Sequence, residues 1–408
     1  MRLINSSLSN KINDVTVLLT TGCTMSCGYC FEHQRDHSRD AMMSPLTFID
    51  IIKRHVALGT KFDLNLFGGE PTLNKSCLKA LILYLESNKS LETPFFIHIQ
   101  TNAYAIDNEI LEMLRDISIL SPCGLGICIS IDSTNIKGNT HRVNHDGEST
   151  WDTVYNNIVR IHDSVPGAYI DTHSVFTNEN APFFAQTVMT LKKMVDDKII
   201  DNFGMNWVDP DTIGFDLSEE AVEIVLDQYW NIIYPSIKSD NWSEYTVSGF
   251  MVMGLDTDIP LEDNPNDSNY SVCGAGSTSI AYTPDGDMVP CHKFIDKRAE
   301  NLILDISELP LKKEDVSGDD DYSCIECPLK HGCQTCVASN IMYGGHIHQQ
   351  SKRMCKRKIM IYKKMMRYKL QAQRKLLDEM INDSSVLSED INNLTIMIGE
   401  LLAKQKIK

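Results

Sequence analysis

The sequence predicts an α/β fold built on a parallel sheet, and two observations carry this prediction. Between residues 15 and 235, six short runs rich in β-branched and aromatic residues alternate with six amphipathic stretches of helical length. The runs are almost continuously apolar, which is typical of parallel strands covered on both faces. We therefore expect βαβ units, with functional residues on the loops that follow the carboxyl ends of the strands.

The elements follow one another in regular order along this part of the chain. The expected strands are 16–21, 62–67, 95–101, 124–132, 168–177 and 202–208. The expected helices are 45–58, 75–88, 107–116, 151–163, 183–196 and 218–235. Two of these helices begin with start signals, Ser44 before Pro45 and Thr150 before Trp151.

Beyond these repeats, which fill residues 1–235, the chain changes character three times. Residues 236–270 are polar and turn-rich, which predicts a linker. Residues 271–355 carry seven cysteines among many Gly, Pro and Asp residues, and such a segment is better held by metal than by apolar burial. Residues 356–375 contain nine Lys or Arg and no Asp or Glu, with apolar residues at helical spacing. We expect the tail, 356–408, to be helical and to dock on the protein's own acidic body.

Charge and hydropathy exclude several classes of protein. The 408 residues include 38 Lys and Arg against 55 Asp and Glu, a net charge of −17, which opposes non-specific binding to nucleic acid. The sequence has no run of 18 apolar residues and no signal-peptide pattern at its start. These features indicate a cytoplasmic protein that does not enter a membrane.

Thirteen cysteines are more than a cytosolic protein needs for packing, and in a reducing compartment dense cysteines indicate metal ligands. Ten of them fall into two groups, one near each end of the chain. The other three, Cys77, Cys123 and Cys128, are expected to be ordinary buried small residues.

The first group lies in TTGCTMSCGYCFE, where Cys23, Cys27 and Cys30 have the spacing C-x3-C-x2-C. Structural zinc needs four ligands, and no fourth cysteine lies nearby, although His33 and His37 could be recruited. A four-iron cluster held by three thiolates leaves one iron open to a small molecule.

This spacing, with Tyr29 before the last cysteine, resembles the radical S-adenosylmethionine (radical SAM) superfamily. The resemblance implies a partial (β/α)6 TIM-like barrel and a [4Fe-4S] cluster held by the three cysteines. It also implies that SAM binds the open iron, with Tyr29 beside it. In that family, reduction cleaves SAM to a 5′-deoxyadenosyl radical that abstracts a hydrogen atom from the substrate. Zinc or coincidence is the alternative.

Further motifs extend the resemblance at the ends of later strands. FGGEPT resembles the family's GGE motif, in which Gly68 and Gly69 let the backbone approach a ligand and Glu70 offers a carboxylate to the SAM ammonium. Arg142 would contact the SAM carboxylate, although a surface salt bridge is the alternative. The remaining cofactor-binding residues that the resemblance implies are Asn102 of QTNA and Ser130 and Asp132 of SIDS.

The second cysteine group consists of Cys273, Cys291, Cys324, Cys327, Cys333, Cys336 and Cys355. Their order and spacing resemble the SPASM domain, a small iron–sulfur domain with two auxiliary [4Fe-4S] clusters, so the resemblance implies three clusters in all. The family usually has three residues where two separate Cys333 and Cys336, and two zinc sites are the alternative. The implied ligands are Cys324, Cys327, Cys333 and Cys355 for the distal cluster, and Cys273, Cys291 and Cys336 for the nearer one, which is one thiolate short.

One residue separates two branches of the resemblance. In anaerobic sulfatase-maturing enzymes an aspartate usually follows the cysteine equivalent to Cys291 and acts as a base, whereas this chain has His292. Several maturases of ribosomal peptides carry the same Pro-Cys-His sequence. His292 could act in catalysis or serve only as a hydrogen-bonding partner.

We therefore expect a radical SAM enzyme that modifies a ribosomally made precursor peptide, through a thioether, C–C or C–O crosslink or an oxidised residue. Its catalytic residues are not assigned. The expected partners are the precursor peptide and an electron donor such as flavodoxin or ferredoxin. The 22 residues before Cys23 are too few for a leader-recognition domain, which leaves a separate protein, the linker or the tail. The alternatives are a sulfatase-type maturase and a non-catalytic iron–sulfur electron carrier, which the SAM motifs oppose.

Overall fold

The structure is a computed structural model. It describes residues 12–30, 41–91, 93–255, 274–295, 336–382, 392–393 and 395–399, together with residues 327 and 329. Five of the residues considered above lie outside these ranges: His33, His37, Cys273, Cys324 and Cys333.

The described residues form one sheet of eight strands in the order β6-β5-β4-β3-β2-β1-β7-β8. Neighbours from β1 to β6 are parallel, which confirms the predicted α/β fold. The six strands are β1 (Asp14–Thr20), β2 (Asp63–Gly68), β3 (Phe96–Thr101), β4 (Leu125–Ser130), β5 (Tyr169–Phe176) and β6 (Asn202–Trp207). The sequence did not predict that β7 (Ser279–Tyr282) would pair in parallel with β1, or that β8 (Met288–Val289) would pair antiparallel with β7.

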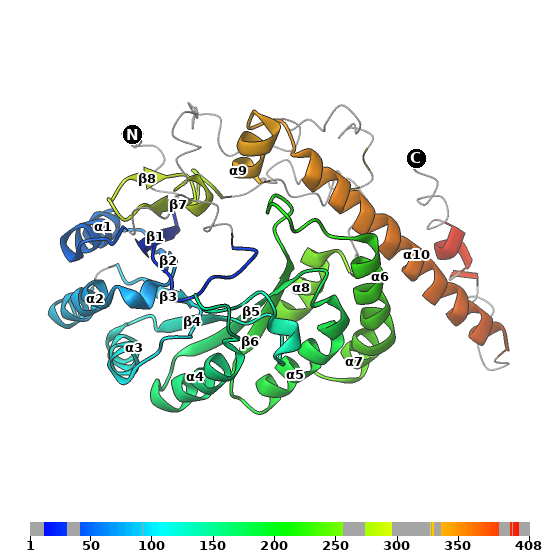
Figure 1. The fold of residues 1–408 in the computed structure, drawn as a ribbon, viewed down its shortest axis with the longest axis horizontal. Helices are drawn as coiled ribbons and strands as arrows, with labels where there is room; N and C mark the ends of the chain where they lie inside the picture. Colours follow the sequence, from blue (N-terminus) through cyan, green and yellow to red (C-terminus); the bar gives the residue numbers. More distant parts are fainter. Residues whose placement is uncertain are drawn as a thin grey trace.

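Helices follow the strands and lie along the outer side of the curved sheet (Figure 1). They are α1 (Pro45–Ala57), α2 (Lys75–Ser87), α3 (Asn108–Leu120), α4 (Trp151–Ser164), α5 (Phe184–Asp196), α6 (Glu219–Gln228) and α7 (Tyr234–Ser239). The Ser44 side chain accepts a hydrogen bond from the Thr47 N–H, as expected of a helix start. Thr150 precedes α4 but caps nothing with its side chain; its hydroxyl donates instead to the Arg142 carbonyl.

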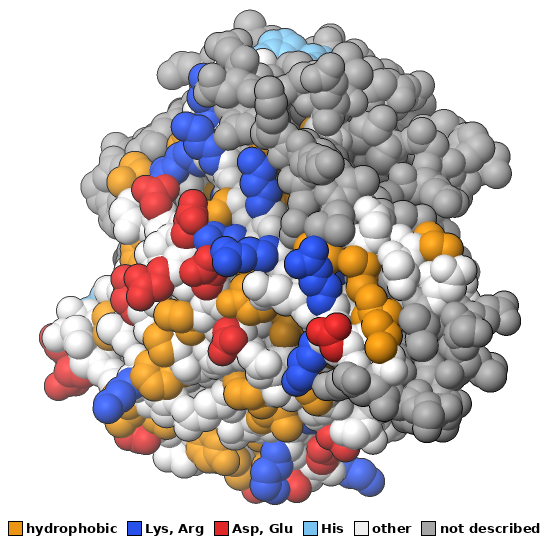
Figure 2. Space-filling view, turned by 90° about the vertical axis from the view of Figure 1, so that its right-hand side faces the viewer, with side chains coloured by type: hydrophobic (Ala, Val, Ile, Leu, Met, Phe, Trp, Pro, Cys, Tyr) orange, Lys and Arg blue, Asp and Glu red, His pale blue; other side chains and the backbone are white. Residues whose placement is uncertain are grey.

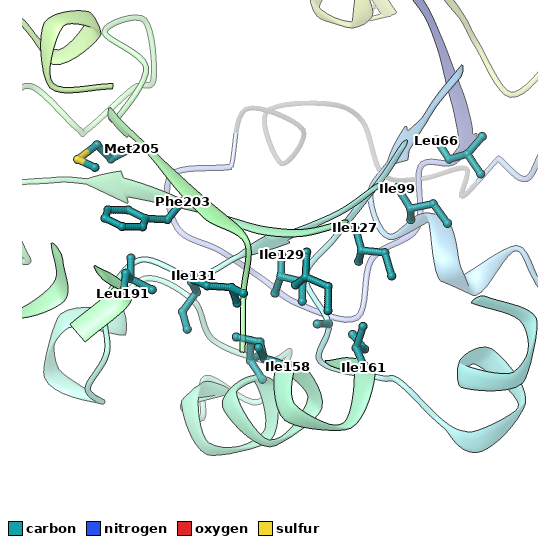
Figure 3. Packing of buried hydrophobic residues seen from close by; sticks show 14 of the residues in the cluster. Leu66, Ile99, Ile127, Ile129, Ile131, Ile158, Ile161, Leu191, Phe203 and Met205 are labelled. Atoms are coloured by element: carbon teal, nitrogen blue, oxygen red, sulfur yellow. The ribbon is translucent and has the colours of Figure 1, made fainter. Parts of the chain in front are cut away.

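The core lies between the sheet and its helices. Figure 3 shows Ile127 and Ile129 of β4 pointing toward Ile158 and Ile161 of α4, and all four side chains are fully buried. Burying each such side chain stabilises the fold by about 1.5–3 kcal/mol. The other face of the sheet is different, because in β3 buried residues alternate with half-buried ones. The expectation of strands covered on both faces therefore fails for β3 but holds for β4 and β6, in which five of six residues are buried.

The sheet curls until its two edges approach each other. Lys293 follows β8 and Asp209 follows β6, the strands at opposite ends of the sheet order, yet their side chains form an ion pair. This contact joins the two ends of the sheet order, which do not pair as strands, across the open side of the six-stranded parallel arrangement. The expectation of a partial (β/α)6 barrel is confirmed.

The stretch expected to be a linker contains a helix, α8 (Glu244–Met253), that packs against β6. The Trp207 indole N–H donates to the Met253 carbonyl at 2.9 Å, and the Thr246 hydroxyl donates to Asn202 Oδ1 at 2.5 Å. The turn-rich composition around these residues hid a short helix that is fixed by its contacts with the barrel. Residues 256–273 lie outside the described ranges.

The basic tail forms a long helix, α10 (Lys352–Asn382), which crosses α6 on the outside of the barrel (Figure 1). Lys364 Nζ lies 2.8 Å from Glu219 Oε2 and 2.7 Å from Glu223 Oε1, both on α6. The expectation that this helix docks on the acidic body is confirmed. A short helix, α9 (Val337–Ser339), precedes it.

Two further expectations concern cysteines and membranes. Cys77 and Cys128 are buried as expected, whereas Cys123 is exposed, because it lies in the turn between α3 and β4.

Within the described residues, no helix is long and apolar enough to cross a membrane.

Candidate active site

The loop of the first cysteine group follows β1 and is held by the segment that contains Arg142. The Ser26 N–H donates to the Val143 carbonyl at 2.8 Å, and the Gly28 N–H donates to the His141 carbonyl at 3.0 Å. His145 Nε2 also donates to the Cys23 carbonyl at 2.9 Å. Two loops more than 110 residues apart thus run side by side, which the sequence did not predict.

Burial favours the protonated form of two thiols in this loop. It raises the pKa of Cys23 to about 12, and it raises the pKa of Cys27 as well. Ligation would have to supply the positive charge that favours thiolates. Among the described residues, no three His, Cys, Asp or Glu side chains are arranged to hold a single metal ion. A four-iron cluster makes a different demand, since its ligands bind different iron atoms.

The two glycines at the end of β2 are required by the approach of two backbones. A Cβ atom on Gly68 would lie 2.2 Å from the Thr20 carbonyl oxygen, and one on Gly69 would lie 2.2 Å from the Gly22 carbonyl oxygen. The Glu70 N–H donates to that same Gly22 carbonyl at 2.8 Å. The sequence predicted close approach to a ligand; in the structure, the glycines bring β2 against the start of the cysteine loop.

Glu70 is completely buried and accepts four hydrogen bonds from neutral donors. Its Oε1 accepts from the Thr72 N–H at 3.1 Å, the Thr72 hydroxyl at 2.7 Å and the Thr101 hydroxyl at 2.8 Å. Its Oε2 accepts from the Asn102 N–H at 2.7 Å. Burial raises the pKa of the carboxyl, while these donors oppose the shift. Glu70 therefore joins the carboxyl ends of β2 and β3.

Asn102 extends this network to the first cysteine. Its Nδ2 lies 3.4 Å from Cys23 Sγ and 3.2 Å from Thr24 Oγ1, in hydrogen-bonding geometry. The predicted Glu70 and Asn102 positions therefore lie together beside Cys23, through adjacent strand ends.

A second buried network joins Tyr29, Asp132 and Arg142. The Tyr29 hydroxyl donates to Asp132 Oδ2 at 2.5 Å, and Arg142 Nη1 donates to the same hydroxyl oxygen at 2.9 Å. Arg142 Nη1 also lies 3.8 Å from Asp132 Oδ1. Because Arg142 is only 8% exposed, the alternative of a surface salt bridge is wrong. Ser130, the fourth residue predicted here, is half-buried at the end of β4.

Two aromatic residues that the sequence analysis missed surround Tyr29. The rings of His141 and Phe215 lie edge-on to it, with centroids 6.0 Å and 6.1 Å away. His141 Nε2 lies 3.0 Å from Glu179 Oε2. Phe215 follows β6 without any motif, so no sequence signal could have identified it.

The donor set of this site fits an anionic ligand beside a cysteine-held cluster. Arg142 Nε is buried and has no hydrogen-bond acceptor among the described residues. A buried guanidinium donor without an acceptor is costly, and the carboxylate of a ligand would satisfy it. Three thiols with C-x3-C-x2-C spacing lie on the adjoining loop.

The described part of the second cysteine group begins with a hairpin. β7 and β8 are joined by a turn in which Gly286 has a φ of 86°, a conformation that favours glycine. This turn leads to Cys291, as the GDMVPC element predicts. The next residue, His292, lies with its ring 5.1 Å from the Phe67 ring at the end of β2. The hairpin therefore brings Cys291 to the edge of the sheet that carries Glu70.

Lys293 and its partners form a cluster that we call the clasp: Asp209, Asp211, Lys293 and Ser351. Asp211 and Ser351 are buried, whereas Asp209 and Lys293 are half-buried. Lys293 Nζ pairs with Asp209 Oδ2, and the Ser351 hydroxyl donates to Asp211 Oδ1 at 3.0 Å. Burial alone would raise the pKa of Asp209, but the Lys293 ammonium lowers it below its ordinary value. The clasp joins three distant segments, and the sequence analysis missed it because neither acid lies in a motif.

The inner face of the barrel is polar and partly open. His98 of β3, His173 of β5 and Asn206 of β6 are each half-buried on it. Asn206 Nδ2 donates to His173 Nε2 at 3.0 Å, and His98 Nε2 lies 3.6 Å from Asp171 Oδ1. These side chains come from positions that alternate with the outward core residues. They form a polar wall below the strand ends.

Comparison with protein families identifies the N-terminal part of this arrangement. Residues 17–191 match the model of the radical SAM superfamily. These residues therefore form a radical SAM domain, and this domain makes the chain an enzyme. The family implies SAM and a [4Fe-4S] cluster as cofactors. No curated protein sequence matches the chain.

Solved structures share the fold along most of the chain. SuiB of Streptococcus suis bound to S-adenosylmethionine is 17% identical with a TM-score of 0.57, covering 85% of this chain and 77% of that one. anSMEcpe with bound AdoMet and the Cp18Cys peptide is 15% identical with a TM-score of 0.60, covering 88% and 98%. At these identities the similarity shows a common fold.

Proposed function

We propose that this chain is a peptide maturase that removes hydrogen from a ribosomally made precursor peptide and installs a crosslink or an oxidised residue. The observation that carries the proposal is the joining of Glu70, Asn102, Tyr29, Asp132 and Arg142 beside the first cysteine loop. When bound, the cluster and SAM supply a 5′-deoxyadenosyl radical that takes a hydrogen atom from the substrate.

The residues of the chain would share the work of holding the cofactors. Cys23, Cys27 and Cys30 would hold the first cluster, and Glu70 would orient the adjacent strand ends. Arg142 would bind the SAM carboxylate through the donor that has no acceptor among the described residues. The Tyr29 hydroxyl, which donates to Asp132 and accepts from Arg142, would keep the guanidinium in this position.

The second cysteine group would hold two auxiliary clusters as a SPASM domain. Four of its seven cysteines are described, and each is half-buried: Cys291, Cys327, Cys336 and Cys355. The hairpin that brings Cys291 to the strand ends supports a cluster near the substrate, where it could accept the electron left after hydrogen abstraction.

A peptide substrate is supported by two observations. The inner face of the barrel carries half-buried polar side chains, which could form hydrogen bonds to the amide groups of a peptide. One structure with the same fold, anSMEcpe, contains the Cp18Cys peptide. A sulfatase-type maturase, which would make formylglycine, is the second candidate. His292, in place of the acid expected there, favours the first candidate.

The experiment is mass spectrometry after anaerobic incubation of the reconstituted chain with SAM and dithionite. One arm contains a short peptide encoded next to the gene, and the other contains a CxPxR-type sulfatase peptide. We expect the first peptide to become lighter by about two hydrogens, since one C–H and one X–H bond are exchanged for one C–X bond. Formylglycine in the sulfatase peptide would favour the second candidate.

A further inference from the structure

Six of the eleven Lys and Arg side chains of α10 fall into two sets with different surroundings. The first set holds the helix to the protein: Arg353 pairs with Asp216, and Lys364 pairs with Glu219 and Glu223. This set accounts for the docking of the helix and uses only part of its positive charge.

The second set faces solvent, and we call it the basic stripe: Lys356, Lys363, Arg367 and Arg374. All four side chains are exposed, and none makes a hydrogen bond or an ion pair with another described residue. They follow one another at intervals of seven, four and seven residues, which places them on one side of an α-helix over about 27 Å. Figure 2 shows Lys and Arg side chains distributed across the face of the molecule on which α10 lies.

The stripe contrasts with the rest of the molecule. The chain has a net charge of −17, so the molecule as a whole repels an acidic protein at long range. A row of exposed cations on such a molecule restricts an acidic partner to one face, and charge complementarity of this kind chiefly sets orientation and association rate.

We propose that the basic stripe is the docking surface for an acidic one-electron carrier protein. This inference rests on the proposed function, because reductive cleavage of SAM consumes one electron that must come from outside the chain. Cys355, a predicted ligand of the distal cluster, lies in α10 immediately before Lys356, so a carrier on the stripe would lie over that end of the helix. An acidic precursor peptide is the competing occupant.

The electron balance of the step is simple. A flavodoxin in its hydroquinone form loses one electron to the enzyme and becomes the semiquinone. The enzyme gains that electron, and no bond forms between the two proteins. A contact of this kind is small and dissociates readily, as transient redox interfaces do.

The test replaces the stripe and keeps the docking set. In the variant K356E/K363E/R367E/R374E, the charge of the stripe is reversed. A matched control, K53E/K61E/K89E/K198E, makes the same change in charge at four exposed lysines of the barrel. The probe is flavodoxin, and its affinity for the reconstituted chain is measured at about 20 mM and 200 mM salt. SAM cleavage is measured separately with flavodoxin hydroquinone and with dithionite.

We expect the stripe variant to bind flavodoxin at least about tenfold more weakly than wild type at low salt, and to lose most of the salt dependence. Its dithionite-driven cleavage of SAM should match that of wild type, because dithionite needs no docking surface. Equal flavodoxin affinity in the stripe variant and wild type would overturn the proposal. An equal loss in the control, or loss of affinity only for an acidic precursor peptide, would also overturn it. Failure of wild type to cleave SAM with dithionite would reject the proposed function, while the affinity measurements would still decide the docking surface.

Discussion

The Glu70 network and the clasp are both polar, the first fully buried and the second partly, but they are built in opposite ways. Glu70 accepts from neutral donors on its own loop and on the end of the neighbouring strand. The clasp pairs ions and joins segments 84 and 140 residues apart. The first follows from the order of parallel strands, whereas the second forms only when the two edges of the sheet have met.

This difference predicts where each network is vulnerable. Removing the cation from the clasp leaves two carboxyl groups that are largely shielded from water without their partner, which is among the costlier changes in a protein. Changing Glu70 leaves neutral donors without an acceptor, at a smaller cost, but it does so beside the predicted SAM site. The clasp should therefore dominate stability and the Glu70 network should dominate cofactor affinity.

The largest expected effect is on the clasp. Lys293→Met leaves Asp209 and Asp211 without their cation and should lower the free energy of unfolding by about 3 kcal/mol. This is the low end for a buried pair, because the Lys293 and Asp209 side chains are 20% and 25% exposed. The measurement is urea unfolding, followed by fluorescence. Lys193→Met is the control, since Lys193 makes an exposed pair with Asp197 that contributes less than about 1 kcal/mol. If both variants lose the same stability, the clasp does not close the barrel.

The next effect concerns the strand ends. In Glu70→Gln, the amide NH2 group would face one of the donors that now bond to the carboxylate, so one hydrogen bond is lost. SAM affinity should therefore fall about 10–100-fold, or roughly 1.5–3 kcal/mol of binding free energy. Calorimetric titration of SAM into the reconstituted chain measures this. Iron content should stay at the wild-type level, because Glu70 is not a predicted cluster ligand. Unchanged SAM affinity would mean that GGEPT is only a turn.

The smallest effect concerns an uncharged hydrogen bond between the barrel and the C-terminal segment. His55 Nε2 of α1 lies 3.1 Å from the Tyr282 hydroxyl of β7, and burial lowers the pKa of His55 from 6.5 to about 4. Below pH 6.5 the unfolded chain binds a proton that the folded chain does not, so stability falls as the pH decreases toward 4. Between pH 7 and pH 5 this amounts to about 2 kcal/mol.

Urea unfolding of wild type and His55→Gln at pH 7 and pH 5 measures how much stability each protein loses on acidification. The variant should lose less stability than wild type on acidification, because glutamine does not titrate. The same loss in both proteins would show that His55 is protonated in the folded state.

The sequence was sufficient to predict the features that local patterns determine. The six parallel strands and their helices lie within a few residues of their predicted positions, because alternating strand and helix patterns specify both element and order. The grouping of Glu70, Asn102 and Asp132 with the cysteine loop was also predictable, since the carboxyl ends of neighbouring parallel strands meet at one edge of a sheet.

Features that depend on chain closure were not predictable in this way. β7 contains only four residues and pairs with β1, more than 250 residues earlier in the chain, so no local pattern marks it as a sheet strand. Asp209 and Lys293 have no motif, and only the curvature of the sheet brings them together. The helix α8 was missed because its stretch is turn-rich on both sides, and tertiary contacts with β6 stabilise it.

The central claim is that the cysteine loop and the strand ends form a site that cleaves SAM. The most direct measurement is the amount of 5′-deoxyadenosine formed per chain when the anaerobically reconstituted protein is incubated with SAM and dithionite. The account predicts formation by wild type and none by the C23A/C27A/C30A variant. Zinc-loaded wild type that takes up no iron and forms no 5′-deoxyadenosine, or equal formation by the triple variant, would contradict it.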